Sequence, residues 1–269
     1  MSCDHDYTPY DHPEILGRLF YPRPEWNLPL TNGKVIPLSI PVEGDVRLGA
    51  YFHPSALHRP TILFFHGNGE IASEYHDLAP FFMDRGLNFL PVDYRGYGRS
   101  GGRPTVSAMM ADCGPILDFC REWLATEGYT GPLIVMGRSL GSAPALEIVH
   151  RFPAYCDALI IESGFAHVGP LFSLLGIDSR GLSLPDEDLF RHPEKIRSFK
   201  KPTLIIHAQF DHIIACSEGA ALYEASGAEE KRFLKIKGAN HNNIFALGMT
   251  QYMDAVVELA GLIAGGSQG

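Results

Sequence analysis

Long apolar runs and a secretion leader are absent from this chain of 269 residues. Nowhere do about 18 apolar residues follow one another, which is the length that a membrane-crossing helix needs. The first residues, Met-Ser-Cys-Asp-His-Asp-Tyr, lack the basic start and the apolar core of a signal peptide. We therefore expect a cytoplasmic protein with no integral membrane association.

Cysteine and positive charge are also scarce. The five cysteines form no CxxC pair, and their odd number leaves at least one unpaired in any intramolecular scheme. Reduced thiols are the simpler interpretation of such usage. Lys and Arg total 22 against 31 Asp and Glu, a formal net charge of -9. This negative field opposes phosphate backbones, so nucleic acid is not an expected partner.

The remaining composition is that of an ordinary globular protein, with 45% hydrophobic and 20% charged residues. A chain of this length buries most of its apolar surface, and α/β folds of this size often form one domain. We expect a single domain over 1–269. The sequence carries no signal for an oligomeric state.

Short apolar runs alternate along the chain with longer segments of helical spacing. Each run has strand length and lies between turn signals. The expected strands are 61–65, 87–92, 133–137, 158–161, 203–206 and 232–236. The expected helices are 71–85, 105–126, 140–152, 217–226 and 243–263. This alternation predicts an α/β fold with a mostly parallel sheet and helices on both faces.

Three segments depart from simple alternation. Segments 35–41 and 46–53, joined by Glu-Gly-Asp, predict an antiparallel hairpin at one edge of the sheet. Gly114-Pro115 predicts a kink or a break within 105–126, because proline lacks the N–H. The segment 164–199, about 35 residues, is too long for a simple crossover and predicts a small cap over the active site. A surface excursion that extends the core is the open alternative.

A candidate nucleophile lies in Gly-Arg-Ser-Leu-Gly at 137–141, between an expected strand and an expected helix. Such a G-x-S-x-G turn holds its serine in a strained conformation, and larger residues at the two glycines would collide with the turn. The motif predicts Ser139 as the nucleophile, the alternative being a simple helix cap. Arg138 has two open interpretations, contact with an anionic substrate group or a structural salt bridge.

A serine hydroxyl needs a base, and in this type of fold the base follows the acid along the chain. His241 follows the last expected strand, and Asp211 follows the strand at 203–206, so their order predicts base and acid. Glu162, at the end of the previous strand, is the alternative acid. The other candidates, His66, His207 and Asp93, are interpreted as structural residues at strand ends.

Acyl transfer also needs N–H donors for a tetrahedral oxyanion. The residue after the nucleophile, Leu140, supplies one. Asn68, in His-Gly-Asn-Gly-Glu at 66–70 directly after a strand, is the expected second donor. A tight turn that needs glycine for its shape alone is the alternative.

These motifs, with Asp-Tyr-Arg-Gly-Tyr-Gly-Arg-Ser-Gly-Gly at 93–102, closely resemble the α/β-hydrolase superfamily. Within it the chain is similar to the BEM46-like and the ABHD13- and ABHD17-like serine hydrolases. The resemblance implies an eight-stranded sheet and hydrolysis of carboxylic esters or acyl thioesters, with protein depalmitoylation in some eukaryotic relatives. This sequence shows neither their N-terminal cysteine cluster nor a membrane span, so a membrane-bound depalmitoylase is not expected.

The predicted activity is therefore hydrolysis of a small-molecule acyl ester or thioester through an acyl-enzyme on Ser139. This chemistry requires no metal and no organic cofactor. A serine peptidase of the same fold is the alternative enzyme. A binding protein on a hydrolase scaffold is the alternative of another class, although its expected signature is an incomplete set of catalytic residues.

Overall fold

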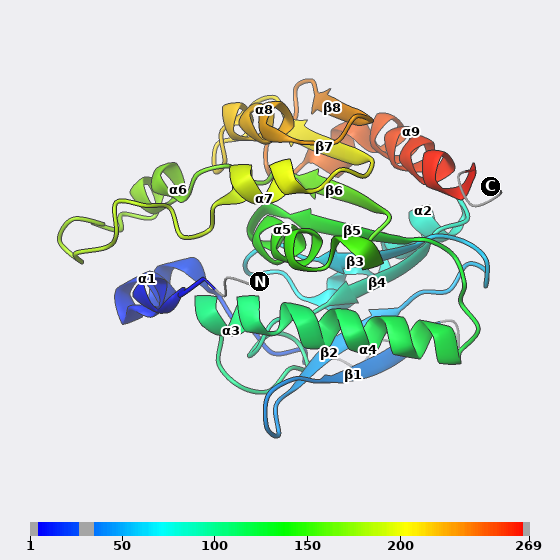
Figure 1. The fold of residues 1–269 in the computed structure, drawn as a ribbon, viewed down its shortest axis with the longest axis horizontal. Helices are drawn as coiled ribbons and strands as arrows, with labels where there is room; N and C mark the ends of the chain where they lie inside the picture. The colour runs from blue at the N-terminus through cyan, green and yellow to red at the C-terminus, as the bar shows by residue number, and fades with distance from the viewer. Residues whose placement is uncertain (1–4, 27–34, 266–269) are drawn as a thin grey trace.

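The computed structural model describes residues 5–26 and 35–265, so Cys3 lies outside the described part. Within these ranges eight strands form one sheet in the order β1-β2-β4-β3-β5-β6-β7-β8 (Figure 1). The strands are β1 (Ile36–Pro41), β2 (Arg47–Phe52), β3 (Thr61–Phe65), β4 (Asn88–Val92), β5 (Leu133–Arg138), β6 (Ala158–Glu162), β7 (Thr203–Ala208) and β8 (Lys231–Ile236).

Strands β3 to β8 pair in parallel, whereas β1 pairs antiparallel with β2 and β2 antiparallel with β4. The mostly parallel sheet and the edge hairpin are therefore confirmed. Because parallel strands all end on one side, the loops after β3, β5, β6, β7 and β8 come together at the carboxyl edge of the sheet.

The side chains of the central strands alternate between two cores, as the two-residue period of a strand requires. Leu63 and Phe65 of β3 enter one core, and Ile62 and Phe64 enter the other. Both faces are buried, which explains why these strands read as unbroken apolar runs in the sequence.

Helices cover both faces of the sheet (Figure 1). On the larger core lie α3 (Val106–Ala111), α4 (Cys113–Thr126), α5 (Ser142–Arg151), α7 (His192–Ser198) and α8 (Cys216–Ala225). On the other core lie α2 (Ala79–Met83) and α9 (Ile244–Gly265). Among the helices of the described ranges, none has both the length and the apolar character needed to cross a membrane.

Two expected helices are broken. The segment 71–85 forms a 3-10 helix, Ala72–His76, followed by α2, because Pro80 lies in the first turn of a new helix. The segment 105–126 divides at Asp112 into α3 and α4. Pro115 has no N–H for the carbonyl four residues earlier, so the predicted break occurs just before the proline.

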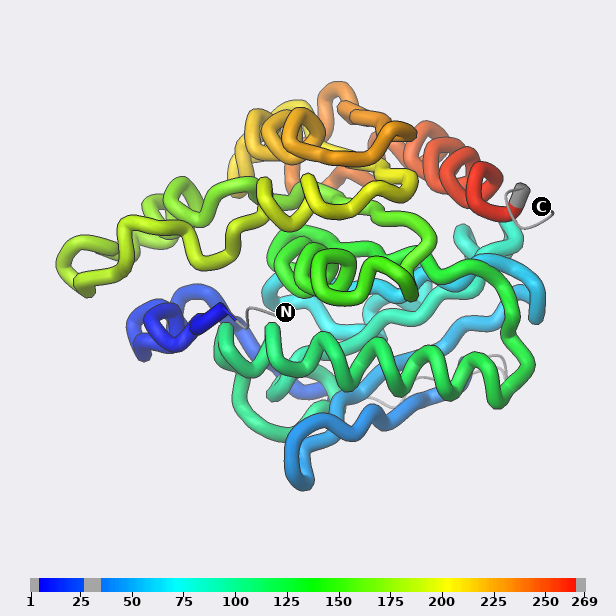
Figure 2. The backbone as a smooth tube through the Cα atoms, in the orientation of Figure 1, coloured from blue at the N-terminus to red at the C-terminus, as the bar shows by residue number. Residues whose placement is uncertain are grey.

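The segment 164–199 packs on an N-terminal segment for which no structure was predicted. The N-terminal segment holds a 3-10 helix, Thr8–Asp11, and α1 (Pro13–Leu19). The segment 164–199 holds α6 (Val168–Leu174) and α7. The Tyr10 ring lies 5.2 Å from that of Phe172, and Arg18 donates to the Leu175 carbonyl over 2.8 Å. In Figure 2 the two segments extend together past the sheet. Helices this short carry little periodic signal in a sequence.

Candidate active site

The loop after β5 turns sharply into α5 at Ser139. Ser139 has φ 52°, in the left-handed region that non-glycine residues rarely adopt. A Cβ at Gly137 would lie 2.1 Å from the Gly141 carbonyl oxygen, and one at Gly141 would lie 2.1 Å from that of Phe65. Both motif glycines are therefore required by close backbone contacts, and the strained turn presents the serine hydroxyl at the sheet edge.

Ser139, His241 and Asp211 form one line of hydrogen bonds. The Ser139 hydroxyl lies 3.0 Å from His241 Nε2, and His241 Nδ1 lies 2.7 Å from Asp211 Oδ2. With the Nδ1 proton held by the carboxylate, Nε2 is free to accept the serine proton. All three side chains are buried or nearly so.

The Asp211 carboxylate is held from its own loop as well. Burial alone raises its pKa, but hydrogen bonds from His241 and from the Ile213 and Ile214 N–H groups bring that pKa below the usual value. Asp211 is therefore ionised at neutral pH, which suits a group that fixes the His241 tautomer.

The end of β3 and the start of the loop 66–70 lie against the turn at Ser139, since a Cβ on Gly141 would lie 2.1 Å from the Phe65 carbonyl oxygen and 2.8 Å from that of His66. Glu70 accepts from the Gly67 N–H over 2.7 Å, which closes the loop on itself. The Asn68 side-chain oxygen accepts from the Tyr97 hydroxyl and from the Tyr21 N–H. The Asn68 side chain is thus engaged by Tyr21 and Tyr97, and the Asn68 backbone belongs to the loop 66–70.

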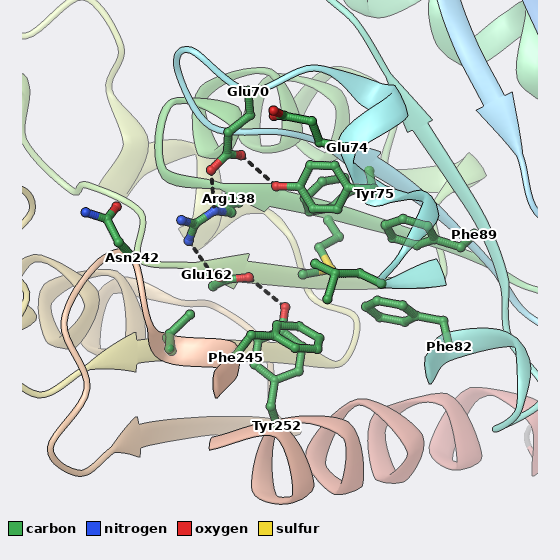
Figure 3. Close-up of a pocket in the computed structure, with 14 residues that line it drawn as sticks. Glu70, Glu74, Tyr75, Phe82, Phe89, Arg138, Glu162, Asn242, Phe245 and Tyr252 are labelled. Carbon is green, nitrogen blue, oxygen red and sulfur yellow. Dashed lines mark hydrogen bonds and ion pairs between the residues drawn. The ribbon is translucent and has the colours of Figure 1, made fainter. Parts of the chain in front are cut away.

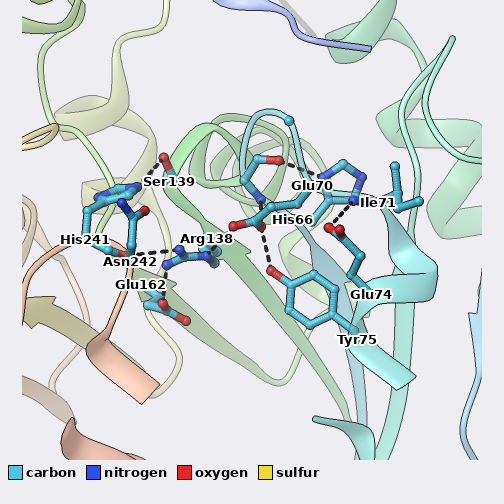
Figure 4. A network of polar contacts seen from close by, with 12 residues as sticks. His66, Glu70, Ile71, Glu74, Tyr75, Arg138, Ser139, Glu162, His241 and Asn242 are labelled. Carbon is cyan, nitrogen blue, oxygen red and sulfur yellow. Dashed lines mark hydrogen bonds and ion pairs between the residues drawn. The ribbon is translucent and has the colours of Figure 1, made fainter. Parts of the chain in front are cut away.

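Arg138 joins three loops of the site (Figure 4). Its guanidinium donates to Glu70 over 2.9 Å and to Glu162 over 2.6 Å. A third N–H donates to the His241 backbone carbonyl over 3.1 Å. The attraction of the two carboxylates outweighs the burial of Arg138 and raises its pKa well above the usual value. Of the two interpretations of Arg138, the structural salt bridge describes its contacts.

Glu162, the alternative acid, is engaged elsewhere. One carboxylate oxygen accepts from Arg138, and the other accepts from the Tyr252 hydroxyl over 2.7 Å. The structure brings Asp211 rather than Glu162 to His241. Glu162 is the last residue of β6, whereas Asp211 lies in the loop after β7, and of these two carboxylates only that of Asp211 contacts His241 in the described structure.

The remaining strand-end residues hold loops. His66 Nε2 lies 3.2 Å from Asp93 Oδ1, and Asp93 also accepts from the Ala72 N–H. His207 Nε2 lies 2.9 Å from the Ile214 carbonyl oxygen, which steadies the loop that carries Asp211. These contacts agree with the structural interpretation of His66, His207 and Asp93.

A cavity of about 220 Å³ lies beside this network, on the α9 side of the sheet (Figure 3). Arg138, Glu70 and Glu162 border one end of it. Its apolar lining includes Phe64, Phe82, Phe89, Met136 and Phe245. None of the residues that line it belongs to 164–199, so this cavity owes its shape to other segments. That 164–199 covers Ser139 stays a prediction.

Sequence reasoning missed three contributors to the site, Glu70, Tyr75 and Tyr252. Tyr75 donates to Glu70 over 2.6 Å, and Tyr252 holds Glu162. A signal was present for Glu70 alone, since a carboxylate three residues after Gly67 is spaced to accept its N–H. Within residues 5–26 and 35–265, no group of three or more His, Cys, Asp or Glu is arranged to hold a metal ion.

Comparison with known proteins identifies relatives of this chain. Residues 56–178 match the family model described as serine aminopeptidase, S33. The chain is 32% identical over 215 residues to mouse alpha/beta hydrolase domain-containing protein 17C, an alignment that spans 74% of this chain and 60% of the mouse protein. It is 30% identical over 224 residues to an uncharacterized protein of Mycobacterium tuberculosis, spanning 81% of this chain and 76% of that protein.

Solved structures agree on the fold. The Pyrococcus furiosus esterase Pf2001 superposes with a TM-score of 0.71 at 18% identity, covering 91% of this chain and all of the esterase chain. Est1E of Butyrivibrio proteoclasticus, solved with ferulic acid bound, superposes with a TM-score of 0.70 at 19% identity, covering 84% of this chain and 98% of Est1E. The sequence matches and the shared fold show that the chain belongs to the α/β-hydrolase family. Within this family it is similar to alpha/beta hydrolase domain-containing proteins 17B and 17C.

Proposed function

We propose that this protein is a serine hydrolase that cleaves carboxylic esters or acyl thioesters through an acyl-enzyme on Ser139. The observation that carries the proposal is the hydrogen-bonded line from Asp211 through His241 to Ser139. A serine that only caps a helix has no need of the strained φ of 52° or of an imidazole nitrogen 3.0 Å from its hydroxyl, and such strain is typical of functional sites. Similarity to proteins described as esterases supports the same reaction class.

In the proposed mechanism, Ser139 Oγ attacks the acyl carbonyl carbon while His241 Nε2 takes its proton. The carbonyl π electrons move to oxygen, and the N–H groups of Leu140 and Asn68 donate to that oxyanion. His241 then returns the proton to the leaving alkoxide or thiolate as its bond to carbon breaks. Water repeats the two steps on the acyl-enzyme and releases the acid.

Arg138 and Glu70 prepare the site before substrate arrives. Glu70 holds the Gly67 N–H, next to the proposed Asn68 donor, and Arg138 holds both Glu70 and the His241 backbone. The Arg138–Glu70 ion pair and the Arg138 hydrogen bond to His241 therefore hold the proposed oxyanion loop, the end of β5 and the loop of the proposed base together, and fixed donors cost no reorganisation during reaction.

The test is hydrolysis of p-nitrophenyl esters from acetate to palmitate by the native protein and by Ser139→Ala. We expect release of p-nitrophenol by the native protein and loss of at least three orders of magnitude in the variant. An absence of activity on every ester and on acyl thioesters by folded native protein would reject the proposal. Equal activity in Ser139→Ala would reject Ser139 as the nucleophile.

Peptide-bond cleavage is the second candidate, and the description of the matched family model as a serine aminopeptidase favours it. The same three side chains can attack an amide, whose leaving amine also takes its proton from the base. Parallel assays with an aryl ester and an aminoacyl p-nitroanilide separate the two. A higher kcat/KM for the anilide would favour the peptidase.

A further inference from the structure

Tyr97 lies in the motif at 93–102, which takes no part in the proposed mechanism, and its side chain is fully buried. Its hydroxyl donates to the Asn68 side-chain oxygen over 2.7 Å and accepts from the Tyr21 N–H over 2.8 Å. The Tyr21 nitrogen also lies 2.8 Å from the Asn68 oxygen. Burial raises the pKa of Tyr97 above its ordinary value, so the hydroxyl keeps its proton at neutral pH. Two donors from distant segments thus hold one side-chain oxygen of the loop 66–70.

Residues 21–25, the N-terminal strap, are anchored on the loop after β4. The Gly98 N–H donates to the Arg23 carbonyl over 2.9 Å, and the Glu25 N–H donates to the Gly98 carbonyl over 3.1 Å. The Tyr51 hydroxyl, from β2, donates to the Glu25 carboxylate over 2.8 Å. The strap is therefore fixed to the sheet through two of its neighbouring segments.

From this anchor the strap reaches the loop 66–70. Arg23 donates from Nε to the Gly69 carbonyl, and its guanidinium pairs with Glu74, shortly after the loop. The Tyr21 N–H holds the Asn68 side chain of the same loop. The strap thus contacts the loop at two successive residues.

The loop needs such support because Asn68 lies between two glycines. Glycine has the widest backbone freedom of any residue, and Gly69 has φ 76°, in the left-handed region. On one side, Glu70 accepts from the Gly67 N–H over 2.7 Å, and His66 Nδ1 lies 2.8 Å from the Gly67 carbonyl oxygen. The Asn68 side chain supplies the further attachment that fixes the peptide between Gly67 and Asn68.

We propose that Tyr97 and the N-terminal strap are positioning residues for the reaction, which direct the Asn68 N–H toward the oxyanion by holding the Asn68 side chain. The inference rests on the proposed function, in which that N–H is a donor. A donor stabilises the developing charge best when its direction is fixed beforehand, because reorientation during the reaction costs free energy. Loss of this support should therefore lower kcat and leave KM nearly unchanged.

The first experiment measures kcat and KM for p-nitrophenyl acetate in the native protein and in Tyr97→Phe, which lacks only the hydroxyl. Complete loss of one oxyanion donor costs roughly 100- to 1000-fold in kcat, so we expect a misdirected donor to cost at least tenfold, with KM changed less than about twofold. The control is Tyr10→Phe, which loses a buried hydroxyl that accepts from the Leu189 N–H over 3.0 Å. We expect native kcat in the control. Native kcat in folded Tyr97→Phe would overturn the inference.

A second pair of variants tests the strap. Arg23→Met removes the contacts with Gly69 and Glu74, and we expect it to lower kcat at least threefold at unchanged KM. The matched control is Arg85→Met, an exposed arginine that donates to the Phe81 carbonyl over 3.0 Å. Native kcat in folded Arg23→Met, or an equal loss in Arg85→Met, would overturn the role of the strap.

A double variant shows whether Tyr97 acts through Asn68. Asn68→Ala keeps the backbone N–H but removes the side-chain oxygen that Tyr97 and Tyr21 hold. In the Asn68→Ala protein, Tyr97→Phe should then lower kcat by less than about twofold, because the two changes remove the same contact. A general structural role of Tyr97 would instead give losses that multiply, and that result would overturn the inference.

Hydrogen exchange separates this inference from the proposed function, because it needs no turnover. The Gly67 amide, which donates to Glu70, is followed by NMR in the native protein, in Tyr97→Phe and in Tyr10→Phe. We expect at least tenfold faster exchange in Tyr97→Phe alone, since a loosened loop opens more often. Unchanged exchange in Tyr97→Phe would overturn the hold on the loop. Faster exchange in a protein whose native form cleaves no ester would support the hold of Tyr97 on the loop and reject the proposed function.

Discussion

Arg138 Nε donates to Glu70 Oε1 over 2.9 Å, and this ion pair ties the end of β5 to the loop after β3. The two residues are 68 positions apart in the chain. Burial by itself raises the pKa of Glu70, but Arg138 and the Tyr75 hydroxyl bring it below the usual value. The carboxylate that closes the loop 66–70 is therefore kept ionised by the residue next to Ser139.

Replacing Arg138 by Met should destabilise the protein by about 3–5 kcal/mol at pH 7, because it leaves Glu70 and Glu162 without a counter-charge. The pKa of Glu70 is lowered in the folded protein, so the Glu70 carboxylate stabilises the fold above its unfolded pKa of about 4.3. This stabilisation is lost as pH falls through the folded pKa of Glu70. The cost of Arg138→Met should thus shrink toward pH 4. Urea unfolding at both pH values measures it, with exposed Arg180→Met as control.

Removal of the base should affect turnover far more than folding. We expect His241→Ala to reduce kcat/KM for p-nitrophenyl acetate by roughly three to six orders of magnitude, since Ser139 then has no proton acceptor. The matched control is His212→Ala, an exposed histidine of the neighbouring loop. Near-native turnover by a His241→Ala protein with a native circular dichroism spectrum would exclude His241 as the base.

Substitution of each carboxylate by its amide distinguishes Asp211 from Glu162 as the acid that holds His241. Asp211→Asn keeps the shape but no longer holds the His241 Nδ1 proton, so kcat should fall by about four orders of magnitude. Glu162→Gln disturbs Arg138 and Tyr252 and should cost stability before it costs kcat. Steady-state kinetics and thermal melts of both variants decide. A larger loss of kcat in Glu162→Gln would reverse the assignment of the acid.

The turn at Ser139 should tolerate no added methyl group at Gly141. Gly141→Ala places a Cβ 2.1 Å from the Phe65 carbonyl oxygen, a backbone atom that cannot move aside, so we expect misfolded or insoluble protein. Gly261→Ala in α9, where nothing lies within 4 Å, should instead stabilise by about 0.5–1 kcal/mol. Soluble yield and melting temperature report both effects, and a normally folded Gly141→Ala protein would contradict the close contact.

His53 should make the protein less stable in mild acid. Burial, followed by repulsion from His76, lowers the pKa of His53 to about 4 from an unfolded value near 6.5. Because the unfolded chain then binds more protons between these values, stability is full above about pH 6.5 and falls as pH drops toward 4. Between pH 7 and pH 5 the native protein should lose about 2 kcal/mol more than His53→Gln, measured by urea unfolding. Equal losses would mean that His53 titrates normally.

Local patterns carried most of the fold and the choice of candidate residues. The runs that became β3, β5, β6 and β7 were recognisable because strands buried on both faces are short, apolar and bounded by turns. The G-x-S-x-G motif placed Ser139 because a strained turn admits few residue types at its ends. Asp211 and His241 were chosen because each follows a strand and because the acid precedes the base along the chain in this type of fold.

Tertiary structure decided what depended on residues far apart in the chain. The sequence left two interpretations of Arg138, a substrate contact and a salt bridge. The fold places its guanidinium against partners 24, 68 and 103 positions away in the chain, which are the contacts of a salt bridge and a hydrogen bond. No repeating pattern in the sequence predicted that the N-terminal helices pack on 164–199, or that a cavity lies along α9. A repeating pattern reports which face of an element is buried, whereas the identity of the partner on that face is set when distant segments pack together.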